Sequence, residues 1–140
     1  MSNKEASRRS GDSHNEAAGE ACTRRQKGQA AEEAAVLYLS SQGYRVLERN
    51  WRCRTGELDI IAMKAGVLIF VEVRSRSGSG TLGTPEEAVD LRKRDQVRRT
   101  AAVFLHTTRR DNMPVAFDVI AVRLNPDMSI ASLHHIPDAF

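Results

Sequence analysis

The stretch GELDIIAMKAGVLIFVEVRSR, from Gly56 to Arg76, predicts two neighbouring strands joined by a tight turn. Residues 57–63 form the first predicted strand and residues 67–74 the second. The turn between them, Lys64–Gly66, has the length and the glycine that are typical of a hairpin loop. The second strand is apolar on both faces until Glu72, and a strand of this kind lies inside a sheet rather than at its edge.

Acidic side chains interrupt both predicted strands. Glu57 and Asp59 lie in the first strand, and Glu72 lies inside the apolar run VLIFVEV of the second. Burying a carboxylate is costly unless it is paired or holds a metal. Side chains alternate along a strand, so Glu57 and Asp59 share one face, and Glu72 and Arg74 share one face of the neighbouring strand. If the hairpin brings these faces together, Asp59 and Glu72 flank one oxygen-lined site.

Such a site would suit Mg²⁺ or Mn²⁺. Mg²⁺ is commonly held by one or two carboxylates together with waters and a substrate phosphate, and the Val73 carbonyl could complete the shell. A bound divalent cation lowers the pKa of a water and stabilises charge on a phosphate under attack. Arg74 would then hold a phosphate oxygen or orient the water. The alternative is an internal ion pair of Glu72 with Arg74, or of Asp59 with another Arg, in which the acids are structural.

A helix is predicted over residues 26–42, before the hairpin. Its apolar residues recur at helical spacing, and Gly43 is well placed to end it in the left-handed conformation. Glu32 and Glu33 lie on this helix, and either could reach the sheet as a further ligand or remain a solvated helix acid.

The rest of the chain predicts one domain with a mixed sheet flanked by helices. Residues 1–25 contain almost no large apolar side chain, which predicts a disordered polar tail. The order of elements over residues 26–140 is α-β-β-β-α-β-β. The remaining predicted segments are a strand over 44–51, a mobile loop over 75–83, a helix over 84–106 that starts at Thr84 or is broken near Val89–Asp90, a strand over 115–124 and an edge strand over 129–136.

Composition narrows the class of partner. The net charge is +3, and only four of the 21 basic residues are Lys, which favours bidentate contacts with phosphate. The candidate nucleic-acid contacts are Arg76, Arg92, Lys93 and Arg94, although a solvated helix face is the alternative. No apolar run approaches the ~18–20 residues of a membrane span. We therefore expect a soluble, cytoplasmic protein without a membrane partner.

Other polar residues show no further site. The two cysteines, Cys22 and Cys53, fit neither a disulfide framework nor a zinc motif. We interpret His134 and His135 as surface residues. Asp118 interrupts an apolar strand, and we interpret it as an acid that pairs with an Arg or protects a sheet edge.

The motifs occur together in an order that resembles one family. The segments GQAAEEAAVLYLSSQGYRVLERNWRCRTGELDIIA, LIFVEVRSR and AFDVIAV, with the Thr-Pro-Glu-Glu helix start, are similar to the YraN-like family of uncharacterised bacterial proteins over Lys27 to Phe140. That family is similar to archaeal Holliday-junction resolvases of the PD-(D/E)xK nuclease superfamily. The resemblance implies a restriction-endonuclease-like core, with Glu32, Asp59 and Glu72 as the metal-binding acids.

The resemblance also implies a function. It predicts a Mg²⁺-dependent endonuclease acting on DNA, with branched or flapped forms as candidate substrates, structure-selective rather than sequence-specific. Glu57 would contribute from outside the metal site. Arg74 departs from the pattern, which has Lys there, and Arg cannot give up a proton. A catalytically inactive nucleic-acid-binding module and a purely structural protein are the alternatives. A homodimer is expected by analogy with junction resolvases.

Overall fold

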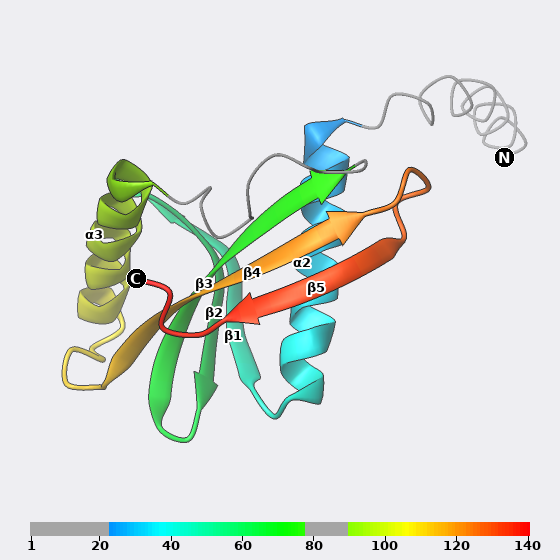
Figure 1. The fold of residues 1–140 in the computed structure, drawn as a ribbon. Coiled ribbons are helices and arrows are strands. Elements are labelled where there is room, and N and C mark those ends of the chain that lie inside the picture. The colour runs from blue at the N-terminus through cyan, green and yellow to red at the C-terminus, as the bar shows by residue number, and fades with distance from the viewer. Residues whose placement is uncertain (1–22, 78–89) are drawn as a thin grey trace, which may run out of the picture.

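Five strands form one mixed sheet with a helix on each face (Figure 1). The structure, a computed structural model, describes residues 23–77 and 90–140. The predicted α/β class and the order α-β-β-β-α-β-β are confirmed, with β3 in the centre of the sheet and β5 at an edge. The elements are α2 (Arg24–Ser41), β1 (Arg45–Cys53), β2 (Gly56–Lys64), β3 (Val67–Ser77), α3 (Leu91–Thr107), β4 (Val115–Leu124) and β5 (Ile130–Ile136).

Side-chain alternation along β3 divides the core into two halves. Ile69 and Val71 face α2, which contributes the fully buried Ala31, Ala35 and Leu39. The residues that alternate with them, Leu68 and Phe70, face α3 and pack against Val97, Ala101 and Phe104. Trp51 belongs to the second half, edge-on to Phe104 with the ring centroids 5.2 Å apart. Trp51 therefore fills the core instead of presenting a ring to a nucleic-acid base.

The central hairpin is paired along only part of its length. The antiparallel ladder of β2 with β3 begins at Lys64 and Val67 and ends at Ile60 and Val71. Beyond that point β3 remains paired in parallel with β4, out to Ser77. Asp59 and Glu72 are the first residues after the end of the β2–β3 ladder, so the two strands separate where the acids begin.

The helix α2 begins at Arg24, two residues before its predicted start. Thr23 and Gln26 form a capping box, in which the Thr23 hydroxyl accepts the Gln26 N–H at 3.1 Å and Gln26 accepts the Thr23 N–H at 3.0 Å. At the other end, Gly43 has a φ of +89°, the left-handed conformation that its position predicted. Neither α2 nor α3 is both long and apolar enough to span a membrane, and no other helix occurs among the described residues.

The helix α3 begins at Leu91 behind the N-cap Asp90, whose carboxylate accepts the Lys93 N–H at 2.8 Å. The predicted start at Thr84 lies outside the described residues, as does most of the predicted loop over 75–83. The described part of that loop is strand, because β3 continues to Ser77, three residues beyond its predicted end.

A buried polar chain joins β4, β5 and α2, and it corrects two interpretations. Asp118 is 2% exposed, and its carboxylate lies 2.8 Å from Nε2 of His135. Nδ1 of the same ring lies 3.1 Å from the Tyr38 hydroxyl, and the Asp138 N–H donates to the other Asp118 oxygen at 3.0 Å. His135 is therefore not a surface residue. Asp118 pairs with a His rather than an Arg, and β4 is not an edge strand.

The packing of α2 on the sheet generates a matched pair of stability predictions. Leu39 is fully buried, whereas Leu37 on the same helix is 64% exposed. We expect Leu39→Ala to lower the free energy of unfolding by about 2–5 kcal/mol, since it removes buried apolar contacts and leaves a cavity. Leu37→Ala should change it by no more than about 0.5 kcal/mol. Urea unfolding followed by circular dichroism measures both, and equal effects would contradict the assignment of the buried face.

Candidate active site

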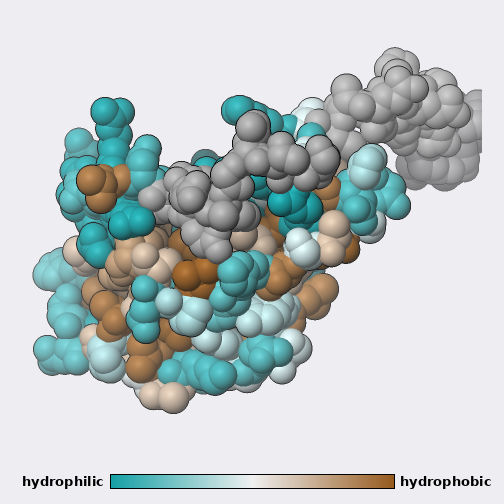
Figure 2. Space-filling model, in the orientation of Figure 1, coloured by the Kyte–Doolittle hydropathy of each residue, from teal (hydrophilic) through white to brown (hydrophobic). Residues whose placement is uncertain are grey.

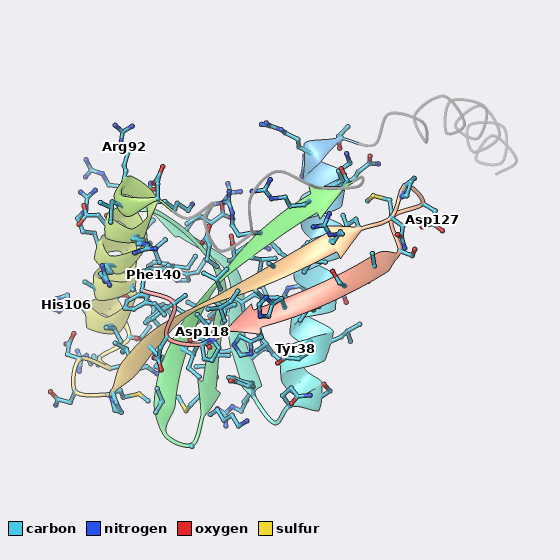
Figure 3. The ribbon with its side chains drawn as sticks, viewed as in Figure 1. Tyr38, Arg92, His106, Asp118, Asp127 and Phe140 are labelled. Carbon is cyan, nitrogen blue, oxygen red and sulfur yellow. The ribbon has the colours of Figure 1, made fainter. Side chains whose placement is uncertain are left out.

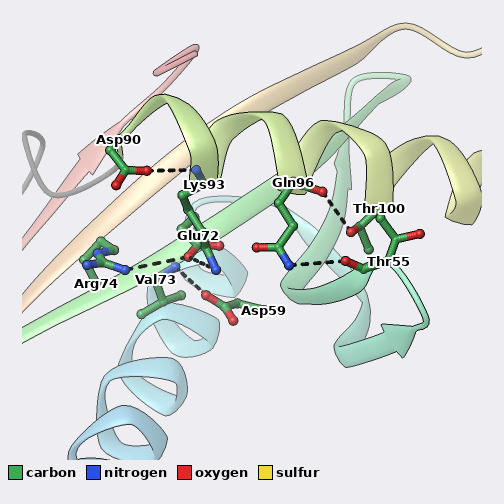
Figure 4. A network of polar contacts seen from close by, with 9 residues as sticks. All are labelled: Thr55, Asp59, Glu72, Val73, Arg74, Asp90, Lys93, Gln96 and Thr100. Carbon is green, nitrogen blue, oxygen red and sulfur yellow. Dashed lines mark hydrogen bonds and ion pairs between the residues drawn. The ribbon is translucent and has the colours of Figure 1, made fainter.

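Asp59 and Glu72 lie together where β2 and β3 separate (Figure 4). One oxygen of Asp59, Oδ2, accepts the Val73 N–H at 2.9 Å. Glu72 is only 4% exposed, and its carboxyl is within hydrogen-bonding reach of Asp59. The structure therefore brings to one point the two acids that the alternation pattern predicted to share a site.

Both carboxyl groups have raised pKa values, and burial is the largest cause in each case. Burial raises the pKa of Glu72 to about 7, and the negative charge of Asp59 adds to this shift, while Lys93 and Arg74 oppose it. The pKa of Asp59 is also raised, chiefly by burial, against the lowering effect of the Val73 N–H. Ionising both carboxyls is therefore unfavourable unless a positive charge lies beside them.

Two basic side chains face Glu72. The Lys93 ammonium lies 3.3 Å from Oε2 of Glu72, and Nη1 of Arg74 lies 3.9 Å from the same oxygen (Figure 4). The predicted alternative of an internal Glu72–Arg74 pair is thus present at the long limit of an ion pair. Lys93, one of the predicted nucleic-acid contacts, is the nearer cation to this buried carboxylate.

The buried face of α3 explains the position of Lys93. Lys93, Val97, Ala101 and Phe104 follow one another at helical spacing, and the last three are buried against the sheet. Lys93 continues this stripe by one turn toward the start of the helix, where the sheet face carries Glu72 instead of an apolar residue. The helical spacing that directs Lys93 toward the sheet is visible in the sequence. The helix was predicted to start at Thr84, however, so Lys93 was not placed in its first turn.

Glu32 and Glu57 interact electrostatically with Asp59, but they do not join Asp59 and Glu72 in one metal-binding group. Burial raises the pKa of Glu32, and the charge of Asp59 adds to the shift, while a hydrogen bond with Asn50 lowers it. Glu57 pairs with Arg52 across the β1–β2 ladder at 3.5 Å. Across residues 23–77 and 90–140, no three His, Cys, Asp or Glu residues lie close enough together to hold a metal. The expected three-acid set is therefore not assembled there.

Glu33, the other helix acid that was considered, lies 3.3 Å from Nη1 of Arg49. Its side chain is 60% exposed, so this pair lies at the surface. Between the two helix acids, Glu32 is the one whose charge couples to Asp59.

The first turns of α2 border two hollows lined by basic residues. One, of about 230 Å³, is lined by Arg24 and Lys27 from α2 and by residues 73–75 of β3, including Arg74. The other, of about 490 Å³, is lined by Glu32 and by residues that include Arg25 and Arg52. Figure 2 shows hydrophilic side chains gathered over the starts of α2 and α3. Arg24 and Arg25 belonged to the predicted tail, whereas Lys27 lay in the predicted helix without a predicted role.

The four predicted nucleic-acid contacts occupy different surroundings. Arg92 is exposed and points away from the sheet at the start of α3 (Figure 3). Arg94 lies over the ring of the C-terminal Phe140, 5.8 Å from its centroid. Arg76 is half-buried near the end of β3. With Lys93 at Glu72, the four residues do not form one uniform basic face.

The N-terminal part of α3, which carries Lys93, is hydrogen-bonded to the β1–β2 turn. Gln96 donates from its side chain to the Thr55 carbonyl at 3.2 Å. A Cβ on Gly56 would lie 3.0 Å from both the Gln96 amide nitrogen and the Thr100 hydroxyl, so glycine permits this close approach. These contacts fix the hairpin that carries Asp59 relative to the helix that carries Lys93.

Comparison with known proteins identifies the family. Residues 31–122 match the family described as "Uncharacterised protein family UPF0102". A UPF0102 protein of Moorella thermoacetica is 47% identical over 118 residues, which cover 84% of this chain and 98% of the relative. A UPF0102 protein of Pseudomonas syringae pv. syringae is 43% identical, covering 84% and 95%, and one of Myxococcus xanthus is 43% identical, covering 84% and 90%. The chain therefore belongs to the UPF0102 family.

Proposed function

We propose that the protein is a metal-dependent endonuclease that hydrolyses phosphodiester bonds in DNA. The observation that carries this proposal is the meeting of Asp59 and Glu72 where β2 and β3 separate, with Lys93 and Arg74 beside them. A structural role alone would leave two carboxyls buried at one point with raised pKa values, an arrangement that costs stability. Raised carboxyl pKa values of this kind are typical of functional sites.

The donor set fits Mg²⁺ or Mn²⁺. Both cations prefer oxygen ligands, and Mg²⁺ usually takes one or two protein carboxylates and keeps waters and substrate phosphates in the other positions. Asp59 and Glu72 supply two carboxylates, and the hydrogen bond from Val73 holds Oδ2 of Asp59. When bound, the cation would supply an activated water and stabilise negative charge on the phosphate.

The residues around the cation would stabilise the charges that develop during hydrolysis. In hydrolysis, the water oxygen bonds to phosphorus and the ester P–O bond breaks. The water gives up one proton to solvent and the departing oxygen takes one up to become a hydroxyl, while the phosphate keeps the water oxygen and the other DNA end. Arg74 would stabilise the charge on the phosphate oxygens, because its guanidinium is always protonated. Glu32 and Glu57 would act from outside the pair, by adding negative charge near Asp59.

The basic hollows beside α2 fit a nucleic-acid backbone. Arg24 and Lys27 lie on the same hollow as Arg74, so a strand whose scissile phosphate reaches the carboxyl pair would place a neighbouring phosphate against them. Such contacts hold the backbone without reading sequence. A preference for branched or flapped DNA, and a homodimer, rest on the resemblance to junction resolvases.

A nucleic-acid-binding module without catalysis is the second candidate. Two observations favour it: the described residues assemble no three-acid metal cluster, and position 74 is Arg. The module predicts DNA binding whose logarithm falls with the logarithm of salt concentration, by about 0.9 for each phosphate contact, and no cleavage with any metal.

Cleavage assays with one substitution separate the two candidates. Purified protein with Mg²⁺ or Mn²⁺ is expected to cut labelled junction, flap or linear DNA, and Asp59→Asn should lower the rate at least roughly 100-fold because it removes a ligand charge. Asp127→Asn, in the β4–β5 turn, is the matched control and should leave the rate unchanged. Equal cleavage by Asp59→Asn would mean a contaminant or a wrong site, and salt-sensitive binding without cleavage would favour the module.

Metal binding should depend on pH. The pKa of Glu72 is raised from 4.5 to about 7, so the folded protein keeps this carboxyl protonated up to near neutral pH, and a proton there competes with the metal. We expect Mg²⁺ affinity to rise about tenfold per pH unit below pH 7 and to level off above it. Calorimetry at pH 6, 7 and 8 tests this, and Glu72→Gln should remove both the slope and most of the affinity. A pH-independent affinity would contradict the site.

A further inference from the structure

Two adjacent basic residues at the start of α3 face in different directions. Arg92 is exposed and extends away from the sheet (Figure 3). Lys93 turns toward the sheet, its side chain only 36% exposed and its ammonium 3.3 Å from Oε2 of Glu72. From the sequence, both residues are candidate nucleic-acid contacts. Of the two, the structure places only Lys93 at the carboxyl pair of Asp59 and Glu72.

The position of the Lys93 backbone is fixed by contacts of α3, in addition to the ion pair that its side chain makes with Glu72. Asp90 accepts the Lys93 N–H and begins the helix there. One turn further, Val97 is buried on the same face, and Gln96 is bonded to Thr55 of the β1–β2 turn. The backbone that carries Lys93 is thus held to the same hairpin that carries Asp59.

The charge and shape of Lys93 suit the phosphate that the carboxyl pair would receive. An ammonium is a compact point charge with three donors, so one N–H can stay with Glu72 while another reaches a phosphate oxygen. Arg74 lies further from Glu72, at 3.9 Å, and borders the hollow that contains Arg24 and Lys27. Lys93 approaches the same Glu72 oxygen from a different element, α3, whereas Arg74 is carried by the strand of Glu72 itself.

We propose that Lys93 is a catalytic residue, which donates a hydrogen bond to a non-bridging oxygen of the scissile phosphate while Glu72 holds its ammonium in place. This inference rests on the proposed nuclease function. Lys93 transfers no proton and forms no covalent bond. It stabilises the negative charge that grows on the phosphate as the water oxygen bonds to phosphorus and the ester oxygen departs. Arg92, one residue earlier, contacts the DNA backbone outside the site.

The experiment compares Lys93→Gln with Arg92→Gln in the full-length protein. Three quantities are measured: the single-turnover cleavage rate at saturating DNA, the dissociation constant for DNA in Ca²⁺, and the Mg²⁺ affinity by calorimetry at pH 8.5. Thermal unfolding of each variant checks that it folds. Lys93→Arg serves as the conservative variant, because it keeps the charge and changes its shape.

Lys93→Gln is expected to lower the cleavage rate roughly 100-fold, as loss of one charge-stabilising donor does, and to change DNA affinity by less than about threefold. It should also tighten Mg²⁺ binding severalfold, because a positive charge beside Glu72 is removed. Lys93→Arg should recover part of the rate. Arg92→Gln should show its effect in the DNA dissociation constant and reduce the salt slope by about 0.9, with no change in Mg²⁺ affinity.

Different failures have different meanings. If wild type cleaves DNA and Lys93→Gln cleaves it equally fast, the catalytic role of Lys93 is wrong and the nuclease function stands. Matching profiles for Lys93→Gln and Arg92→Gln would make Lys93 an ordinary backbone contact. If wild type neither binds Mg²⁺ nor cleaves, the nuclease function fails and the role of Lys93 fails with it.

Discussion

The hydrogen bond from the Val73 N–H to Oδ2 of Asp59 takes the place of the next ladder bond between β2 and β3. Because a side chain satisfies that backbone donor, the strands can separate after Ile60 and Val71 without leaving a buried N–H unpaired. The separation makes room for two carboxyl groups between strands that are otherwise closely packed. The same bond fixes one Asp59 oxygen, so the direction of the carboxyl is set by the sheet and not by a mobile side chain.

The cost of this arrangement is electrostatic. Glu72 follows Leu68 and Phe70 on a face that is otherwise apolar, and α3 covers that face. An apolar side chain at position 72 would extend the core and remove the repulsion from Asp59. Lys93 and Arg74 offset part of the negative charge, yet the pKa of Glu72 is still raised to about 7. Such a pair therefore lowers stability unless other groups offset its charge.

Local patterns in the sequence predicted most of the fold. The short turn with the glycine after Ala65 and the apolar run before Glu72 were sufficient for the hairpin, and Gly43 for the end of α2. The candidate acid pair followed from the same alternation, because facing positions on paired strands are a local consequence of a short turn. The contacts that the sequence did not indicate include one between distant segments, that of Tyr38 with His135.

In the candidate site, too, local patterns were predictable and distances between separate elements were not. Whether Glu32 and Glu57 reach the pair depends on how far α2 and the β1–β2 turn lie from Asp59, and no pattern within either element carries that distance. The position of Lys93 was in principle readable, because it continues the buried stripe of α3 by one turn.

The contacts that dock α3 therefore set the chemistry as much as the acids do. Gly56 allows Gln96 and Thr100 to approach the β1–β2 turn, and a shift of the helix along the sheet would carry Lys93 away from Glu72 while leaving every acid in place. Arg74 would then be the nearest cation, held on the same strand as Glu72. The arrangement of a site whose cation comes from a separate element thus depends on packing between elements as well as on its acidic residues.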